Sequence, residues 1–105
     1  MNRFYFMAWQ KTRESKYHTP MKRMAALVAK GGKVISIATN CTGKHAERRA
    51  LRPHVNYDGA TIYVARINHR ISRPCKKCMK MIRLAGIKRI AYIGLAGNFT
   101  IEHVY

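Results

Sequence analysis

Two short motifs hold the side chains that could do chemistry, HAE at residues 45–47 and PCKKC at residues 74–78. An imidazole and two thiolates are ligands that zinc prefers, and a catalytic zinc site takes three protein ligands and leaves a fourth position for water. His45, Cys75 and Cys78 would supply those three ligands. The sequence therefore predicts a catalytic zinc site built from two separate segments of the chain.

Glu47 follows His45 within the same predicted helical turn. A carboxylate at that place could take a proton from zinc-activated water and pass it to a substrate nitrogen. Because both motifs open predicted helices, the free N–H groups and positive dipole ends of those helices would stabilise thiolates and a zinc-bound hydroxide. Glu47 is therefore the predicted catalytic acid and base.

A CxxC pair also occurs in structural zinc sites and in redox proteins. A structural zinc site would need a fourth protein ligand, which Cys41 or His69 could supply. A redox pair would leave the HAE motif without a role. The combination of both motifs at predicted helix starts favours the catalytic site over these two alternatives.

Turn and helix signals divide the chain into regular elements. The Gly31-Gly32 pair between two apolar runs predicts a hairpin, Pro53 predicts the end of a helix, and Pro74 suits the first position of another. With the hydrophobic pattern, these signals predict helix 4–16, strands 24–30 and 33–40, helix 45–52, strand 60–67, helix 74–85, and strands 87–93 and 99–105. This order predicts a three-layer α/β/α fold around a five-stranded mixed sheet, with the last two strands antiparallel.

The length and the cysteine count limit the class of protein. The chain has 105 residues, which suits a single domain spanning residues 1–105. Three cysteines are too few for a disulfide framework, which indicates a reducing compartment such as the cytoplasm. No apolar run approaches the ~20 residues of a membrane span, and the short apolar start lacks a signal-peptide cleavage site. Neither membrane insertion nor secretion is predicted.

The charge is strongly one-sided, with 21 Lys and Arg against 4 Asp and Glu and a formal net charge of +17 at pH 7. Such a surface attracts polyanions, although charge alone identifies no chemistry on them. Residues 66–89 contain many basic side chains and no acid. Within this stretch, Arg70 and Arg73 lie on a predicted loop beside the first thiol. They could rim the pocket and either hold the phosphate of a nucleotide or steer a single strand.

The motifs and their order resemble those of the cytidine and deoxycytidylate deaminase superfamily, whose zinc-dependent members carry H-x-E followed by P-C-x-x-C. The resemblance covers nearly the whole chain and implies zinc held between two helices, hydrolytic deamination, and an acid and base role for Glu47. It also implies that the backbone of Ala46 contacts the base. Asn40, at the end of a predicted strand, takes the place of an asparagine that binds the sugar in the family.

Features of several branches of that superfamily are mixed in the sequence. The segment RPCKKCMKMIRLAGIKRI resembles small phage-type deoxycytidylate deaminase-like proteins, which would suit a virus-encoded protein. Arg48 resembles an arginine that offsets thiolate charge in tetrameric cytidine deaminases, and a solvated helix arginine is the alternative. The antiparallel last strands favour the cytidine deaminase branch, but IATNCTGK lacks the N-x-E-N pattern of enzymes that act on free cytidine.

The predicted function is zinc-dependent hydrolytic conversion of cytosine to uracil in a cytidine or deoxycytidine nucleotide. The substrate would be free, as in deoxycytidine monophosphate (dCMP), or within a single-stranded nucleic acid. Conversion of adenosine to inosine in RNA, as in tRNA-type deaminases, is one alternative. A nucleic-acid-binding module with structural zinc is another. Because relatives form dimers or tetramers, a homo-oligomer is also expected.

Overall fold

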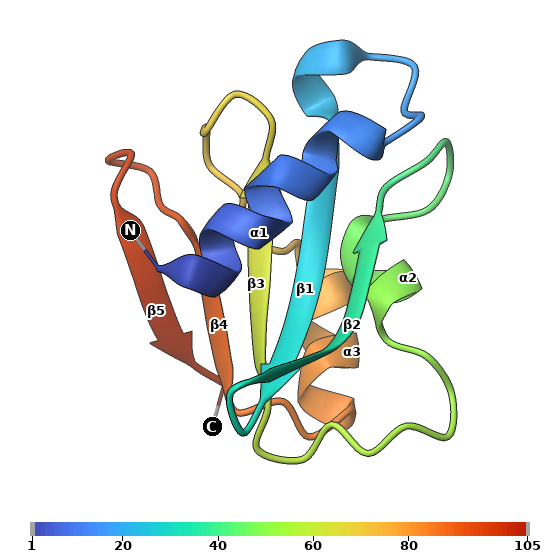
Figure 1. Ribbon diagram of the computed structural model, residues 1–105, viewed down its shortest axis with the longest axis vertical. Coiled ribbons are helices and arrows are strands. Elements are labelled where there is room, and N and C mark those ends of the chain that lie inside the picture. Colours follow the sequence, from blue (N-terminus) through green and yellow to red (C-terminus); the bar gives the residue numbers. More distant parts are fainter. Residues whose placement is uncertain (1, 105) are drawn as a thin grey trace.

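The computed structural model describes residues 2–104, and its centre is a mixed sheet of five strands in the order β2-β1-β3-β4-β5 (Figure 1). β3 and β4 are parallel, whereas the other neighbouring pairs are antiparallel. The strands are β1 (Met24–Lys30), β2 (Lys33–Thr39), β3 (Thr61–Arg66), β4 (Arg89–Ile93) and β5 (Phe99–His103). The predicted five-stranded mixed sheet and its antiparallel last pair are confirmed.

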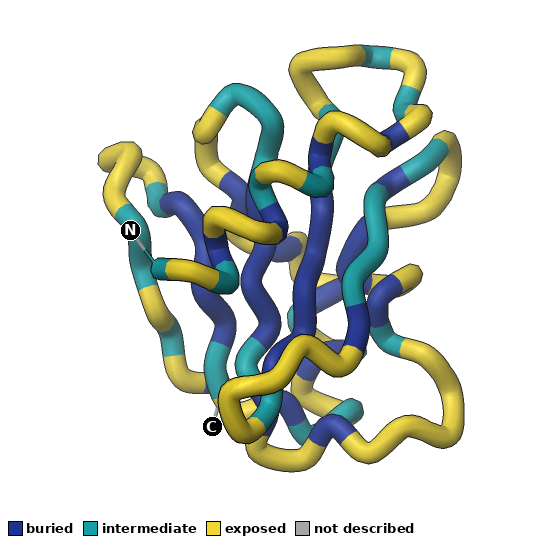
Figure 2. The backbone as a smooth tube through the Cα atoms, viewed as in Figure 1, coloured by how far each residue is buried: buried dark blue, intermediate teal, exposed yellow. Residues whose placement is uncertain are grey.

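Helices cover both faces of this sheet. Helix α1 (Arg3–Lys11) lies in front of the sheet in Figure 1 and buries Tyr5 against Leu27, whereas α2 (Ala46–Ala50) and α3 (Lys76–Leu84) lie behind it. The central strands are buried on both faces (Figure 2), which explains why their sequences are continuous apolar runs rather than alternating ones. The predicted three-layer α/β/α architecture is confirmed.

The sheet topology brings three strand ends to one edge. Met24 at the start of β1 pairs with Arg66 at the end of β3, and Ala25 pairs with Thr39 at the end of β2. Helix α2 follows β2 in the chain and α3 follows β3, so both helices begin at this same edge. The two motifs therefore meet in space because each one immediately precedes or opens one of these helices.

The hairpin between β1 and β2 forms as the Gly-Gly pair predicts. Gly31 and Gly32 have φ values of 59° and 78°, and Lys30 pairs with Lys33 across the turn. Two successive residues with positive φ define the two-residue turn that matches the twist of an antiparallel pair, and glycine adopts this conformation at no steric cost.

Helix α1 ends at Lys11, earlier than the predicted residue 16. A single 3-10 turn covers Thr12–Glu14, and the Thr12 hydroxyl donates to the carbonyl oxygen of Trp9 at 2.6 Å. Ser15 is then extended, with ψ of 137°, and its side chain bonds to Asn40 across the molecule. A tertiary contact thus replaces the last predicted turn of the helix.

Both motif helices are also shorter than predicted. Helix α2 ends at Ala50 because the Tyr57 hydroxyl accepts a hydrogen bond from the Arg52 amide at 2.8 Å and donates one to the Ala50 carbonyl at 3.1 Å. Helix α3 begins at Lys76 with Cys75 as its N-cap, so Pro74 precedes the helix instead of opening it. The strand ends differ from the prediction by a residue or two, and residue 105 lies outside the described residues.

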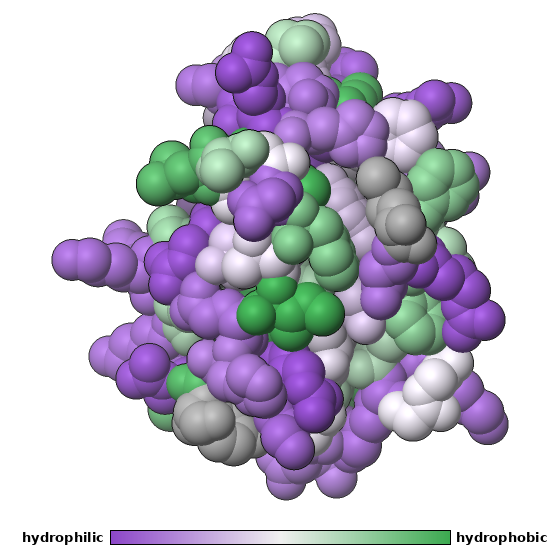
Figure 3. Space-filling model, turned by 90° about the vertical axis from the view of Figure 1, so that its left-hand side faces the viewer, coloured by the Kyte–Doolittle hydropathy of each residue, from purple (hydrophilic) through white to green (hydrophobic). Residues whose placement is uncertain are grey.

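None of the helices within residues 2–104 is long and apolar enough to cross a membrane. Figure 3 shows the side of the molecule that carries β5, where hydrophilic side chains cover most of the surface and apolar ones form small groups between them. The expected homo-oligomer stays a prediction.

Candidate active site

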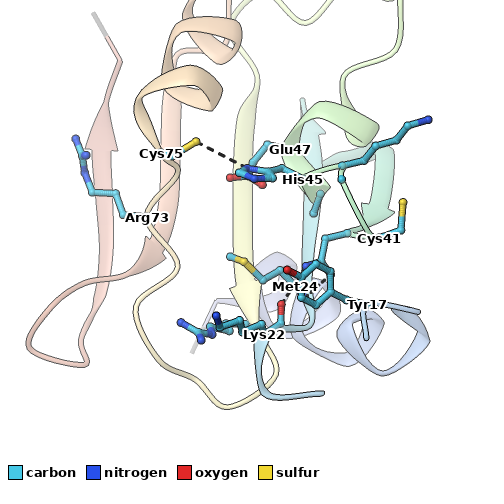
Figure 4. Close-up of a pocket in the computed structure, with 13 residues that line it drawn as sticks. Tyr17, Lys22, Met24, Cys41, His45, Glu47, Arg73 and Cys75 are labelled. Carbon is cyan, nitrogen blue, oxygen red and sulfur yellow. Dashed lines mark hydrogen bonds between the residues drawn. The ribbon is translucent and has the colours of Figure 1, made fainter. Parts of the chain in front are cut away.

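His45 and Cys75 occupy the same structural position in two different helices. Each is an N-cap residue with extended backbone, at φ −75° and ψ 151° for His45 and φ −71° and ψ 171° for Cys75. Neither side chain caps its own helix with a hydrogen bond. Both side chains are therefore free to point into the space between the helices, where Cys78 also lies, one turn into α3 (Figure 4 shows His45 and Cys75).

The three predicted ligands form a metal-sized cluster. His45 Nδ1 lies 3.3 Å from Cys78 Sγ and 3.8 Å from Cys75 Sγ, and all three donor atoms lie within 4.8 Å of one another. Tetrahedral zinc, with bonds of about 2.0–2.3 Å, separates neighbouring nitrogen and sulfur ligands by roughly 3.5–3.8 Å. The donor set and its spacing therefore fit zinc.

A fourth protein ligand does not join this cluster among the described residues. Cys41 and His69, the candidates for a structural site, lie elsewhere. Cys41 is in the wall of the pocket, and the His69 ring stacks on Trp9 with centroids 4.5 Å apart. The three-ligand arrangement corresponds to a catalytic zinc site rather than to a closed structural one.

Burial controls the protonation of the residues at this site. Burial first, and then the nearby Glu47 carboxylate, raise the pKa of the Cys78 thiol to about 12. Burial likewise raises the pKa of Glu47, which is 3% exposed, against smaller lowering effects from a backbone hydrogen bond and from His45. Without a cation, burial therefore favours the protonated forms of Cys78 and Glu47. A divalent metal would supply the positive charge that the thiolates need.

These residues form one wall of a pocket of ≈ 460 Å³, a volume typical of small-molecule sites. His45, Ala46, Glu47 and Cys75 line one end of the pocket. Figure 4 shows Tyr17, Lys22 and Met24 at the opposite end. The remaining lining residues are Asn40, Cys41, Gly43, Lys44, Arg66 and Arg73.

Asn40 lies in this pocket with most of its amide already in use. Its Oδ1 accepts hydrogen bonds from Ser15 Oγ at 2.7 Å and from the Met24 amide at 2.9 Å, and its Nδ2 donates to the Lys22 carbonyl at 3.0 Å. A carbonyl oxygen has two lone pairs and an amide nitrogen two hydrogens. One N–H is left, so Asn40 can donate a hydrogen bond to a ligand.

Arg73 reaches the pocket wall, but its guanidinium turns towards β5 (Figure 4). Its Nε and Nη2 donate to the two carboxylate oxygens of Glu102 at 3.1 and 2.9 Å. The Tyr92 hydroxyl donates to the same carboxylate at 2.6 Å. Arg73 is thus held by a protein carboxylate instead of being free for a phosphate.

Arg70 does not line the pocket, although the sequence placed it on the rim. Its backbone amide donates to Asn68 Oδ1 at 3.1 Å, and His69 between them has a positive φ of 56°. Arg70 follows this tight turn as an exposed residue, and the turn separates it from Arg66, which does line the pocket.

Arg48 lies outside the main pocket and lines a second cavity of ≈ 270 Å³. This cavity also contains Lys77, Cys78 and Met81, and it shares Gly43 and His45 with the main pocket. The side chain of Arg48 is exposed on α2. A role in offsetting thiolate charge stays a prediction.

Several pocket residues have no motif that could identify them in the sequence. Arg66 lines the pocket because it ends β3 beside the first residue of β1, a register that a single sequence does not reveal. Ser15, which lies outside the pocket lining, holds the pocket residue Asn40 from a segment far away in the chain. The one available signal for Arg66 was its position at the end of a predicted apolar strand.

Comparisons with known proteins agree with this geometry. The family model for the zinc-binding region of cytidine and deoxycytidylate deaminases matches residues 1–94. Curated protein sequences gave no significant match.

Solved structures show the same fold at low identity. The apo dCMP deaminase of cyanophage S-TIM5 gives a TM-score of 0.65 at 23% identity over 86% of this chain and 82% of that one. Its complex with dCMP and dUMP gives 0.65 at 24% identity over 86% and 81%. RibD from Acinetobacter baumannii gives 0.63 at 22% identity over 82% of this chain and 25% of that one.

Proposed function

The chain belongs to the family of cytidine and deoxycytidylate deaminases, and on that premise we propose that it converts cytosine to uracil in a phosphorylated nucleotide, with release of ammonia. Family membership makes it a zinc-dependent deaminase. The observation that carries the proposal is the buried Glu47 carboxyl beside a three-ligand cluster at the end of an open pocket.

Zinc held by His45, Cys75 and Cys78 would supply Lewis-acid activation of the attacking water. Glu47 moves the protons. The reaction forms a C–O bond at the ring carbon C4 of cytosine and breaks the bond from C4 to the amine. One proton of the water goes to ring nitrogen N3 and the other to the departing amine. A single carboxyl within reach of the water and both nitrogens can carry both protons in turn.

The raised pKa of Glu47 suits this task. A carboxyl with an ordinary pKa would be a weak proton donor near neutral pH. Burial raises the pKa of Glu47, which favours the half of its task in which it returns a proton to a nitrogen. The burial that raises this pKa also keeps bulk water from competing for the proton.

The pocket offers contacts that would orient the nucleotide. The free N–H of Asn40 can donate to a sugar oxygen or to the base carbonyl. The Ala46 backbone lies at the start of α2 beside Glu47 and can contact the base edge. Met24 and Tyr17 give the opposite wall an apolar surface for a flat ring.

The charge of the pocket lining is suited to phosphate. The lining includes Lys22, Lys44 and Arg66. Within residues 2–104, the side-chain ion pairs are Lys11–Glu14 and Arg73–Glu102, so these three cations have no carboxylate partner. Arg66 is oriented by a hydrogen bond from its Nε to the Met21 carbonyl at 3.1 Å, and its terminal nitrogens stay available. An unphosphorylated nucleoside would leave this charge unmatched.

The test is to measure ammonia and uracil formation by the zinc-loaded protein on deoxycytidine, dCMP and cytidine monophosphate. Adenosine monophosphate and an adenosine-containing RNA serve as the alternative substrates. The proposal predicts turnover of the cytosine monophosphates, with a KM well below that for deoxycytidine. Turnover of adenine and not of cytosine, with zinc bound, would overturn it.

A further inference from the structure

The main pocket and the second cavity adjoin at the metal ligands. Gly43 and His45 line both, so the two cavities lie on either side of the segment that leads into α2. The lining of the main pocket continues to Lys22 and Arg66, and that of the second cavity continues to Lys77 and Met81 on α3. A ligand longer than one nucleotide that passes over this segment could therefore contact both cavities.

Basic side chains without a carboxylate partner line both the main pocket and the second cavity. Lys22, Lys44 and Arg66 line the first part, and Arg48 and Lys77 line the second. No ion pair among the described residues involves any of them. A free mononucleotide carries its phosphate on one side of the sugar and can pair with the cations of one cavity. A nucleotide inside a strand has a phosphate on each side and can pair with the cations of both cavities.

The acids of the chain do not offset this charge. Glu14 and Glu102 are each ion-paired with a basic residue, and Glu47 is buried. The Asp58 carboxylate lies against Gly86, away from both cavities. With a formal charge of +17, the basic side chains of the protein repel one another. A polyanion bound across the two cavities would reduce that repulsion.

We infer that the cytosine is presented within a single-stranded nucleic acid that crosses both cavities, with its flanking phosphates on Lys22 and Arg66 at one side and on Lys77 and Arg48 at the other. This inference rests on the proposed deamination and names the substrate class for the same site. A base stacked inside a duplex could not reach the pocket.

The experiment compares dCMP with a short single-stranded DNA that holds one cytosine, the same sequence as RNA, and the DNA as a duplex. All four are given to the zinc-loaded chain. The single-stranded forms should be deaminated with the higher kcat/KM and the duplex should not react. With the two flanking phosphates of a single strand neutralised, affinity should fall about 7-fold between 50 and 200 mM salt. The DNA and RNA arms tell which polymer is preferred.

Two substitutions, one in each cavity, test whether the strand contacts both cavities. Lys22→Gln and Lys77→Gln should each raise KM for the strand and lower the salt slope by about 0.7, the value for one phosphate on a single strand. Lys33→Gln removes the same charge at the hairpin, the far end of β1, and should change neither quantity. Strand binding is followed in parallel by fluorescence anisotropy.

The outcomes separate this inference from the proposed function. Deamination of dCMP without deamination of the strand would overturn the strand inference and leave the proposed function standing. An effect of Lys22→Gln without any effect of Lys77→Gln on the strand would likewise overturn it. Strand binding that depends on both lysines, without deamination of any cytosine, would overturn the proposed function.

Discussion

The hydroxyl of Ser15 lies 2.7 Å from the side-chain oxygen of Asn40 and 2.9 Å from its main-chain oxygen. Ser15 is 4% exposed and Asn40 is 7% exposed, so water does not replace either contact. The segment after α1 thus holds the amide of Asn40 in one orientation, with one N–H left for the pocket. Asn40 is a predicted substrate contact, and Ser15 is a positioning residue that acts through it.

Ser15→Ala should weaken substrate binding more than it slows turnover. The Asn40 oxygen loses one partner, which costs about 1–3 kcal/mol of folding free energy for a buried group. KM should rise while kcat changes less, because the proton chemistry at Glu47 stays intact. Steady-state kinetics and urea unfolding measure the two effects.

Ser72→Ala is the matched control. The Ser72 hydroxyl is equally buried, donates to the Val64 carbonyl at 2.7 Å and accepts from the Ile93 amide at 3.0 Å, and lies outside the pocket. It should lower stability without raising KM. An equal rise in KM for both variants would show that Ser15 acts through stability alone.

Removal of zinc should destabilise the folded chain. A metal that binds the folded state adds stability in proportion to the logarithm of its concentration over Kd. Chelation should therefore lower Tm, and Cys78→Ser should abolish stoichiometric zinc binding. Cys41→Ser alters a thiol that lies outside the cluster and should keep the metal. Metal analysis after gel filtration measures the zinc content of each variant. Loss of zinc from Cys41→Ser would contradict the ligand assignment.

The Arg73–Glu102 pair should add stability that depends on pH. Arg73 and Tyr92 lower the pKa of Glu102, so the folded state binds a proton at this carboxyl less readily than the unfolded state does. The contribution is present above the ordinary pKa of a glutamate and is lost as pH falls through the lowered value. Because both side chains are partly exposed, it should be below about 1 kcal/mol.

Urea unfolding of Glu102→Gln and of the unaltered protein, from neutral to acidic pH, isolates the contribution of the Arg73–Glu102 pair to stability. The difference in unfolding free energy should be largest near neutral pH and should shrink as pH falls. A difference that grows towards acidic pH would have the wrong sign for this explanation.

Tyr5→Phe should leave stability unchanged or raise it. The Tyr5 hydroxyl, between α1 and the sheet, is buried without a hydrogen-bond partner among the described residues, and burial raises its pKa. Such a group costs about 1–3 kcal/mol of desolvation, which phenylalanine avoids while keeping the ring contacts. Tyr92→Phe is the contrast, since it loses the bond to Glu102. Thermal unfolding measures the stability of both variants. A marked loss of stability in Tyr5→Phe would show that the hydroxyl makes a stabilising hydrogen bond.

Much of the fold and the metal cluster could be predicted because local signals carry them. Gly31-Gly32 determines the hairpin, and the CxxC spacing puts two thiols on one helical turn. The pocket wall could not be predicted in the same way. The placement of Arg66 depends on strand register, and that of Ser15 on a contact between distant segments. The ion pair between Arg73 and Glu102 forms because β5 lies beside β4. The residues around Arg73 in the sequence give no sign of this contact.

Uracil formation from dCMP by zinc-loaded Glu47→Gln, compared with the unaltered protein, determines whether Glu47 carries the protons of the reaction. Glutamine keeps the shape of the side chain and cannot carry a proton between water and the base. We expect unchanged zinc content and a loss of kcat of about 10²–10⁴-fold or more. Glu14→Gln, at an exposed acid, should keep full activity. Full activity in zinc-loaded Glu47→Gln would show that Glu47 does not move the protons.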